Sequence, residues 1–318
     1  MPDTAAGDGG APRAAYDALR SAAVAVDPRR DVVRASGPDA TAFLQGQLSQ
    51  DVAALRSGAS AWSWLLQPAG KVEALVRATR LDGDAWLLDT DRGWGERVLA
   101  RLNRFKLRTK VDLELMDDWT VVGLRGPDLQ RGDGVPEWLK SASATPGVVA
   151  AVDASWPGLP GVDLIGPGPA APAGIAALDA DGWEAARIET GIPVMGAELN
   201  ERTIPAETGL VDRTVSFTKG CYTGQELVAR IDSRGSNVPR LLRGVRLDGR
   251  VEPGAALRRP DGSDAAVVTS VARSPVSGWV ALAYARRGVE PGMTVSADGG
   301  VEGRVDALPL VGSGTPSA

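Results

Sequence analysis

The sequence predicts an α+β fold that is followed by a small C-terminal antiparallel β-barrel or sandwich. Up to about residue 236, predicted strands, helices and hairpins alternate without the regular βαβ rhythm of a doubly wound sheet. After Arg240, short apolar runs recur between Gly, Pro and Asp turns, as is typical of small antiparallel β domains. The hydrophobic fraction of 43% and the charged fraction of 24% are those of a globular protein with a buried core.

The first elements can be placed in order along the chain. Residues 31–35 predict a strand, and Gly37-Pro38-Asp39 then opens a helix, because proline and an acidic side chain are tolerated in a first helical turn. Further strands are predicted over residues 60–66, 71–80 and 86–88, with turns at 67–70 and 82–84.

In the next segment the spacing of apolar residues changes from that of a helix to that of a strand. Four apolar residues have the spacing of one helical face, which predicts a helix over 94–105: Trp94, Val98, Leu102 and Phe105. Residues 107–115 then alternate apolar and charged side chains, which predicts a half-exposed strand. Residues 119–124 predict another strand.

The remaining elements set the expected domain boundaries. Residues 126–174 are rich in Gly and Pro with short strands predicted at 148–152 and 162–165, and a helix over 183–190 is expected to end before Gly191-Ile192-Pro193. The C-terminal strands are predicted at 241–247, 265–271, 279–284, 293–297 and 301–305. We expect disordered tails over 1–14 and 312–318, an α+β module over 15–236 with an inner subdomain at about 117–180, and a β-barrel over 237–311.

Composition excludes several kinds of chemistry. The 318 residues include no histidine and a single cysteine, so a Ser-His-Asp triad, a Cys-His pair and a histidine-ligated zinc site are excluded within the chain. One cysteine allows no intrachain disulfide and cannot alone hold a four-thiolate iron–sulfur cluster. We predict no metal site. Acid–base work falls to Asp, Glu, Lys, Tyr or bound water.

Charge and hydropathy point to the compartment and the partners. With no signal-like start and no apolar run of about 18 residues, we expect a cytoplasmic protein without membrane contact. A net charge of −5 argues against DNA binding. RNA binding is not excluded, because five basic residues lie close together in the sequence: Arg101, Arg104, Lys106, Arg108 and Lys110. Such a stretch is more often the solvated face of a helix and a strand.

The only cysteine lies in the segment Lys219-Gly220-Cys221-Tyr222-Thr223-Gly224-Gln225-Glu226. The two glycines allow a sharp turn and a close approach of a ligand. Residues from Gln225 onward predict a helix with Thr223 as its N-cap, so Cys221 is expected just before a helix N-terminus. That position and the neighbouring Lys219 favour the thiolate. The alternative is a buried structural cysteine, the usual fate of a lone Cys.

Three glutamates lie near Gly or Pro turns upstream of the cysteine segment: Glu189, Glu198 and Glu207. A carboxylate in a pocket wall can accept two N–H donors from an aminopyrimidine or pterin ring. On spacing alone, solvated loop charges are the favoured interpretation of these glutamates.

The cysteine segment resembles the signature Lys-Gly-Cys-aromatic-x-Gly-Gln-Glu of the YgfZ family, folate-binding relatives of the glycine-cleavage T-protein (aminomethyltransferase) and of mitochondrial factors that mature iron–sulfur enzymes. Supporting segments follow in the same order: Gly37–Gln47, Pro68–Lys71, Phe105–Arg108, Gly191–Pro193 and Glu207–Leu210. The resemblance covers about residues 26–305. It implies a T-protein-like folate-binding module around a central channel, followed by the β-barrel.

The resemblance also implies roles for individual residues. Cys221 and Lys219 look like the functional pair of the family, and Glu189 and Glu207 look like the acids that face the pterin of tetrahydrofolate. The other residues expected around this cofactor are Tyr222, Gln225, Glu226 and Arg230.

One departure separates this chain from the T-proteins. They carry paired aspartates, one of them catalytic, in the strand after a Gly-Gly turn. The matching stretch here is Gly70–Leu75, where the aspartates are absent and only Glu73 is nearby. The departure argues against aminomethyl transfer, although the folate pocket can persist.

Three functions remain under comparison. The first is a folate-binding accessory protein that supports assembly or maintenance of iron–sulfur enzymes, with tRNA modification as one route and iron–sulfur client or assembly proteins as partners. The second is a tetrahydrofolate-dependent aminomethyl- or methyltransferase with Glu73 or Glu207 as base. The third is an RNA-binding module that uses the basic stretch over residues 101–110.

Overall fold

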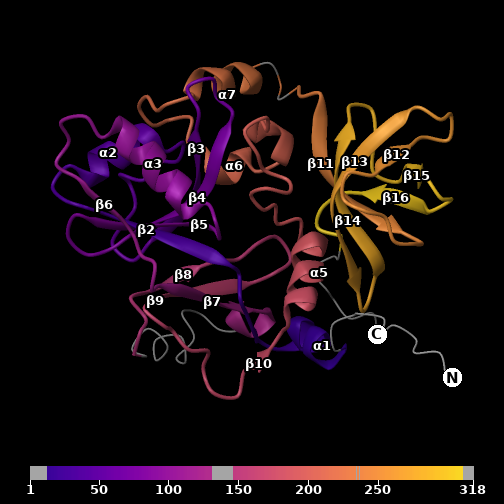
Figure 1. Cartoon of the computed structure of the whole chain (residues 1–318), viewed down its shortest axis with the longest axis horizontal. Coiled ribbons are helices and arrows are strands. Elements are labelled where there is room, and N and C mark those ends of the chain that lie inside the picture. The colour runs from indigo at the N-terminus through magenta and orange to yellow at the C-terminus, as the bar shows by residue number, and fades with distance from the viewer. Residues whose placement is uncertain (1–12, 131–145, 234, 236, 311–318) are drawn as a thin grey trace, which may run out of the picture.

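The computed structural model describes residues 13–130, 146–233, 235 and 237–310. Within them, two five-stranded sheets precede a closed barrel of antiparallel strands (Figure 1). The predicted α+β fold with a C-terminal antiparallel β-barrel is therefore confirmed. No helix within these ranges combines the length and the apolar character that a membrane span needs.

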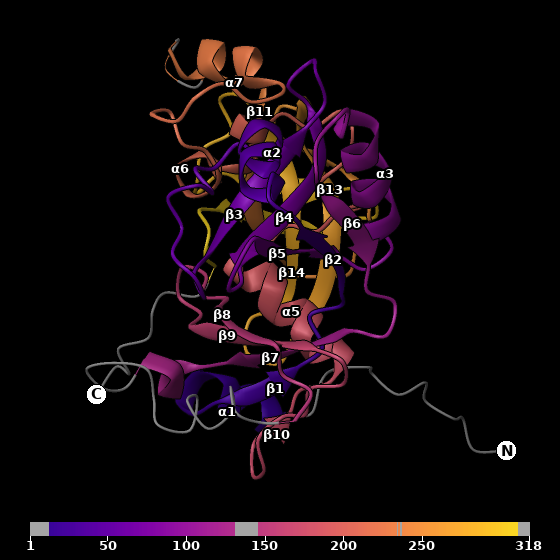
Figure 2. The same cartoon turned by 90° about the vertical axis from the view of Figure 1, so that its left-hand side faces the viewer.

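The first sheet is antiparallel and has the strand order β3-β4-β5-β2-β6. Its strands are β2 (Arg30–Ser36), β3 (Ser60–Leu66), β4 (Val72–Arg80), β5 (Ala85–Asp91) and β6 (Asp112–Leu115). Helices α2 (Ala40–Gln47) and α3 (Gly95–Phe105) cover one face (Figure 2). There Leu44 and Leu102 pack with Val76 and Leu88. Because side chains alternate along a strand, the opposite face carries Arg77 and its neighbours.

The second sheet has the order β10-β1-β7-β9-β8, and only the β1–β10 pair is parallel. Its strands are β1 (Val24–Val26), β7 (Thr120–Arg125), β8 (Ala150–Asp153), β9 (Gly161–Gly166) and β10 (Ala176–Ala177). Four of them fall inside the predicted subdomain at 117–180, whereas β1 comes from near the N-terminus. Helix α1 (Arg13–Ser21) and helix α5 (Ala180–Thr190) pack on this sheet through Tyr16 and Ala185.

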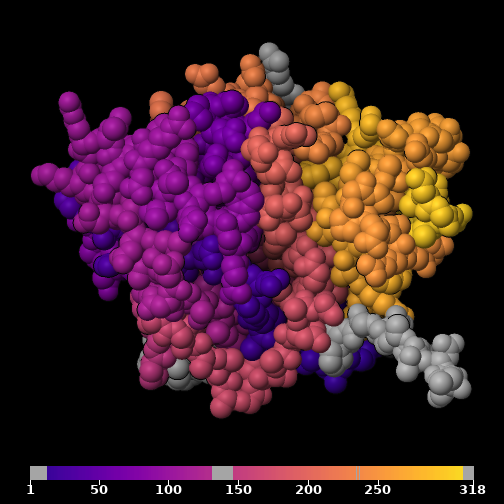
Figure 3. All heavy atoms as spheres, in the orientation of Figure 1, coloured from indigo at the N-terminus to yellow at the C-terminus, as the bar shows by residue number. Residues whose placement is uncertain are grey.

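The barrel closes in the order β11-β14-β13-β12-β15-β16. Its strands are β11 (Arg240–Leu247), β12 (Ala256–Arg258), β13 (Asp264–Ser274), β14 (Gly278–Arg286), β15 (Thr294–Ala297) and β16 (Glu302–Asp306). Helix α5 lies between the barrel and the two sheets and packs against β13 and β14 (Figure 1). The space-filling view shows the barrel directly against the α5 region (Figure 3).

The shorter helical elements are η1 (Pro127–Gln130), η2 (Pro205–Thr208), α6 (Val211–Thr214) and α7 (Gln225–Asp232). Helix α5 ends at Gly191, whose φ of 84° is a left-handed conformation that favours glycine, as predicted for that helix end.

Two predictions need correction. The strand predicted over 107–115 begins only at Asp112, because turn hydrogen bonds from Lys106 N to Asn103 O and from Thr109 N to Lys106 O continue the end of α3 instead. Leu107 is 84% exposed as a result. At the N-terminus, α1 begins at Arg13, inside the predicted tail over 1–14. The rest of that tail and the one predicted over 312–318 lie outside the described residues.

Candidate functional site

Lys219 anchors the cysteine loop to the C-terminal end of α2. Its ammonium donates three hydrogen bonds to main-chain carbonyls, at 2.6 Å to Gln45 O, 2.6 Å to Leu48 O and 2.9 Å to Gln50 O. These carbonyls lie where the helix dipole is negative, so a cation is favoured there. The ammonium also lies 5.1 Å from the centroid of the Tyr222 ring.

Lys219 does not reach the thiol. Among the described residues, no hydrogen bond joins its ammonium to Cys221, and all its hydrogen bonds go to the α2 end. Burial lowers the pKa of Lys219 to about 8, while Asp51 opposes the shift, so the ammonium form dominates at pH 7. The geometry assigns Lys219 a positioning role.

The chain after Cys221 is anchored as firmly as the chain before it. Tyr222 is buried, and its main-chain N–H donates to Gln225 Oε1 at 3.1 Å. The next N–H, of Thr223, donates to Gly46 O at 3.1 Å, again at the end of α2. Cys221 itself is exposed. A loop fixed on both sides therefore presents the thiol to solvent, which removes the alternative of a buried structural cysteine.

Gly224, rather than Thr223, is the N-cap of α7, and its φ is 83°. A Cβ at this position would lie 2.6 Å from Gln67 O and 2.8 Å from Leu66 Cβ. Close packing against the turn after β3 and a left-handed backbone together require glycine. The helix therefore begins at Gln225 as predicted, but its N-cap is Gly224 instead of Thr223.

The two remaining residues predicted on α7 lie on its outer side. Glu226 and Arg230 are both exposed. Within the described part of the chain, neither makes an ion pair with a neighbour that would fix its position.

Glu189 and Glu207 are buried and ion-paired, although Glu189 Oε1 has no hydrogen-bond partner among the described residues. Glu189 accepts hydrogen bonds from Tyr16 Oη at 2.6 Å and from Arg20 Nη2 at 2.7 Å. Glu207 accepts from Arg240 Nε at 3.0 Å and Nη2 at 3.1 Å. Glu198, weighed with them from sequence, accepts from Ser270 Oγ at 2.5 Å and pairs with Arg187. Each of the three carboxylates has partners on different elements, so the three do not form one common site.

A central cavity of about 40 Å³ lies elsewhere, on the face of the first sheet opposite to α2 and α3. Aromatic and charged side chains from both sheets and from α5 line it, notably Trp62, Trp156, Trp183, Arg125 and Asp91. The rings of Trp62 and Trp156 lie 5.6 Å apart at 55°. None of the eight site residues predicted from the sequence lines this cavity.

Asp163, which lines the cavity, belongs to a network of buried ion pairs. The fully buried Arg77 pairs with Asp89 across β4 and β5 at 3.0 Å, and with Asp163 of β9 at 2.7 Å, which joins the two sheets. Burial tends to raise the pKa of Asp163, but Arg125 and Arg77 outweigh it and hold that pKa below its usual value. Burial raises the pKa of Asp91, although Arg30 opposes the shift.

The side chains that line the cavity suit a pterin ring, but the cavity must open before a pterin can enter. Indole rings can stack on a planar ring, and guanidinium groups can pair with carboxylates. Two buried donors, Trp62 Nε1 and Arg125 Nε, have no hydrogen-bond partner among the described residues. The volume of about 40 Å³ is well below the roughly 300–1,000 Å³ of small-molecule sites, so side chains must move for a ligand to enter.

Sequence reasoning missed the cavity residues because they come from distant segments. Trp62 lies on β3, Trp156 follows β8, and Trp183 lies on α5. The available signal was the count of nine tryptophans in a chain with only three tyrosines and three phenylalanines.

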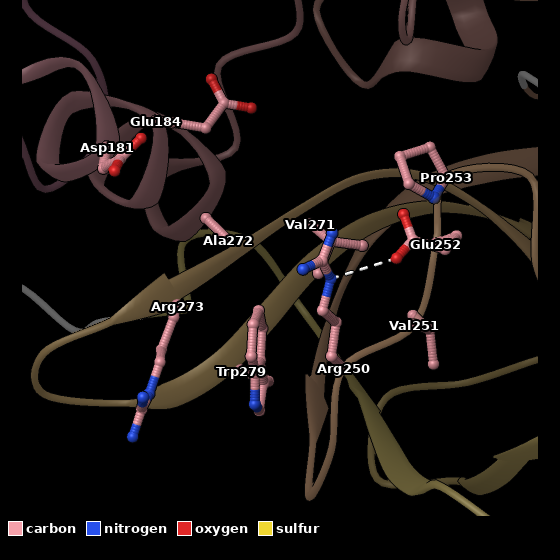
Figure 4. A pocket seen from close by; sticks show the side chains of 10 residues that line it. All are labelled: Asp181, Glu184, Arg250, Val251, Glu252, Pro253, Val271, Ala272, Arg273 and Trp279. Atoms are coloured by element: carbon pink, nitrogen blue, oxygen red, sulfur yellow. Dashed lines mark ion pairs between the residues drawn. The ribbon is translucent and has the colours of Figure 1, made fainter. Parts of the chain in front are cut away.

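A second pocket, of about 380 Å³, opens on the surface between α5 and the barrel (Figure 4). Asp181 and Glu184 of α5 and Trp279, Arg250 and Arg273 of the barrel domain are among the residues that line it. Arg250 is paired with Glu252 at 3.1 Å. Across the ranges that the structure covers, no group of three or more Cys, Asp and Glu is arranged to hold a metal ion.

Comparison with known proteins adds to the geometry. A tRNA-modifying protein YgfZ of Klebsiella pneumoniae is 33% identical over 215 residues, which cover 64% of this chain and 65% of that protein. A mitochondrial iron–sulfur cluster assembly factor IBA57 homolog of Chaetomium globosum is 30% identical over 283 residues, covering 79% and 63%. The resemblance to the YgfZ family that the sequence predicted is therefore confirmed. No family model matches it.

The fold comparison agrees with this relationship. The glycine cleavage system aminomethyltransferase T from Bartonella henselae superposes with a TM-score of 0.77 over 94% of this chain, at 21% sequence identity. At that identity the likeness establishes the fold alone, so the predicted T-protein-like architecture is confirmed. The alignments span less than two thirds of the length of the two YgfZ and IBA57 proteins above.

Proposed function

We propose that this protein is an accessory factor that supports the assembly or maintenance of iron–sulfur enzymes, with Cys221 as the thiol that acts on a partner. The observation that carries the proposal is the construction of the cysteine loop. Lys219 and Thr223 tie the loop to the end of α2, and between them Cys221 is exposed. A thiol held outward on a rigid loop suits chemistry with a second macromolecule.

The surroundings of the thiol support the same use. The chain has no histidine to act as a base, and Lys219 is occupied by three carbonyls. A protease-like nucleophile needs a base within hydrogen-bond reach. We therefore assign Cys221 to a transient bond or ligand exchange with a client protein rather than to turnover of a small substrate.

The test is complementation in cells that lack the protein, with the activity of an iron–sulfur enzyme as readout. We expect Cys221→Ala to fold normally and to restore no more than a small fraction of that activity. Thr218→Ala, an exposed change three residues away, serves as the control and should restore it fully. Full rescue by Cys221→Ala at equal protein level would refute the role of the thiol.

We further propose that tetrahydrofolate binds in the central cavity. When bound, it supplies a carrier for one-carbon units. Support comes from the neighbouring, mutually tilted Trp62 and Trp156 rings, the two unpartnered donors and the carboxylate of Asp91. Asp91 already accepts from Arg30 Nη1 and from Met195 N, both at 2.7 Å, and its remaining lone pairs can accept from the N–H edge of a pterin.

Calorimetry with tetrahydrofolate separates the cavity from the glutamates expected from the resemblance. If the cavity binds, Trp62→Phe and Asp91→Asn should each weaken binding by about tenfold or more, roughly the value of one good polar or stacking contact. Glu189→Gln and Glu207→Gln should leave it nearly unchanged in folded protein. The reverse pattern would move the cofactor to those glutamates, and no binding at millimolar folate would remove it from the proposal.

The transferase reading receives less support. Glu73 and Glu207 are the candidate bases, yet Arg97 lies 3.7 Å from Glu73 and Arg240 holds both oxygens of Glu207. Neither carboxylate lines the cavity. A base must be within reach of the proton that it removes, so we do not assign aminomethyl transfer to this chain.

A further inference from the structure

The turn between α3 and β6 presents an apolar tip surrounded by positive charge. Leu107 is 84% exposed, the most exposed of the large apolar side chains among the described residues. Four cations flank it within a few positions of the chain: Arg104, Lys106, Arg108 and Lys110. In the described part of the chain, none of the four is neutralised by an ion pair. They form a local positive patch on a chain whose net charge is −5.

The turn is held in one conformation. Arg108 has a φ of 58°, an uncommon left-handed value for a residue other than glycine. Lys110 N donates to Asp39 Oδ2 at 2.8 Å, and Lys110 O accepts from Asp39 N at 3.3 Å. Gly37 fits beneath it because any Cβ there would lie 2.5 Å from Lys110 O. A leucine on an anchored turn loses less conformational entropy on binding than a leucine on a mobile loop would lose. The anchored backbone therefore favours a role of Leu107 in binding.

This turn and the cysteine loop are anchored at opposite ends of the same helix. Asp39 precedes the first residue of α2 and holds the Leu107 turn, whereas Lys219 binds the carbonyls at the α2 C-terminal end. The eight residues of α2 span about 12 Å. In Figure 2, α2 lies between α7 and α3 on the face toward the viewer. A protein partner of ordinary size covers about 800 Å² and can contact both loops at once.

We propose that the Leu107 turn is the docking contact for a protein partner whose surface has an apolar socket with an acidic rim. This inference rests on the proposed function, because it names the surface that brings a partner to Cys221. Charge complementarity selects an acidic partner, and the exposed leucine selects one with an apolar socket. The phosphates of RNA could pair with the cations, but RNA offers no apolar socket for an aliphatic side chain.

Fluorescence anisotropy with defined probes tests the surface. The first probe is a labelled peptide that combines Asp and Glu with Leu and Phe, the second is an all-acidic peptide of equal charge, and the third is a single-stranded RNA. We expect the first probe to bind at least tenfold more tightly than the second. Leu107→Ser should remove that difference, and Arg104→Glu/Arg108→Glu should abolish binding of both peptides. Arg250→Glu/Arg287→Glu, a double reversal on the barrel domain, is the matched control and should change neither.

Other outcomes overturn the proposal. Equal binding of the two peptides, binding that survives the double reversal at 104 and 108, or no binding would each do so. RNA bound at least as tightly as the mixed peptide and unaffected by Leu107→Ser would reassign the patch to nucleic acid.

A second readout separates this proposal from the proposed function. In the complementation assay, Arg104→Glu/Arg108→Glu should lower rescue while the rate of Cys221 alkylation stays unchanged. If Cys221→Ala rescues fully but peptide binding depends on Leu107, the thiol role fails and the docking surface stands. Normal rescue by the double reversal would refute the link between this surface and Cys221.

Discussion

Replacing Lys219 by methionine tests whether this residue positions the cysteine loop. The change keeps most of the aliphatic stem and removes three hydrogen bonds of 2.6, 2.6 and 2.9 Å to the end of α2. A hydrogen bond to a charged group contributes about 1.5–3 kcal/mol, but Gln45 and Gln50 are only half-buried, so their freed carbonyls can regain water. We therefore expect a loss of about 2–3 kcal/mol, within the usual range for breaking a polar network.

Thermal and urea unfolding measure that loss. At about 2.1 cal/mol/K of unfolding entropy per residue, this loss corresponds to a fall in midpoint temperature of about 3–5 °C for a chain of 318 residues. Cys221→Ala should change stability by less than about 0.5 kcal/mol, because the side chain is exposed. Lys110→Met, which removes an exposed ammonium, is the matched lysine control and should also be nearly neutral.

Alkylation of Cys221 completes the test. A released loop should expose Cys221 and its neighbours more, so Lys219→Met should react with iodoacetamide at least as fast as the parent protein. If Lys219 instead activated the thiol, the variant would react more slowly at pH 7 and keep its stability. Unchanged stability together with slower alkylation would refute the positioning role.

Two further predictions concern the framework of the site. Gly224→Ala should lower the free energy of unfolding by about 2 kcal/mol or more, because a Cβ would lie 2.6 Å from a carbonyl oxygen. Gly220→Ala, where a Cβ would meet nothing within 4 Å, should be nearly neutral in the same unfolding assay. Equal effects of the two substitutions would contradict the steric account. Asp163→Asn should cost about 3–5 kcal/mol at pH 7, since it leaves Arg77 and Arg125 with one buried partner fewer. The pKa of Asp163 is lower in the folded chain, so its contribution is present above the unfolded value of about 3.9 and is lost as pH falls through the folded pKa. Urea titrations at pH 7 and below pH 4 should therefore show the gap between parent and variant narrowing in acid, and a constant gap would count against this linkage.

Periodicity predicted most of the fold because it reports which side of an element is buried. The strand over 60–66 and the barrel strands follow from apolar alternation between turn residues. The same rule misplaced the strand at 107–115, where Leu107 fits the pattern yet is exposed. Alternation cannot reveal that Arg108 takes a left-handed backbone or that Lys110 is anchored to Asp39.

The site was predictable only where its residues are adjacent in sequence. The cysteine loop lies within one short segment, so its exposed thiol and its glycines could be read together. The cavity assembles Trp62, Trp156 and Arg125 from three segments, and tertiary packing alone brings them together. The pairing of Glu207 with Arg240 likewise depends on how η2 meets the barrel.

The cations in and around the central cavity are all of one chemical type. All of them are guanidinium groups, from Arg30, Arg77, Arg125 and Arg187, and such groups keep their charge at any pH that a cell reaches. A chain without histidine also has no imidazole to change its charge near neutrality. Buried carboxylates, among them Asp91 and Asp163, pair with these cations. Any change in the charge of the cavity with pH must therefore come from its carboxylates or from a bound ligand, and not from its cations.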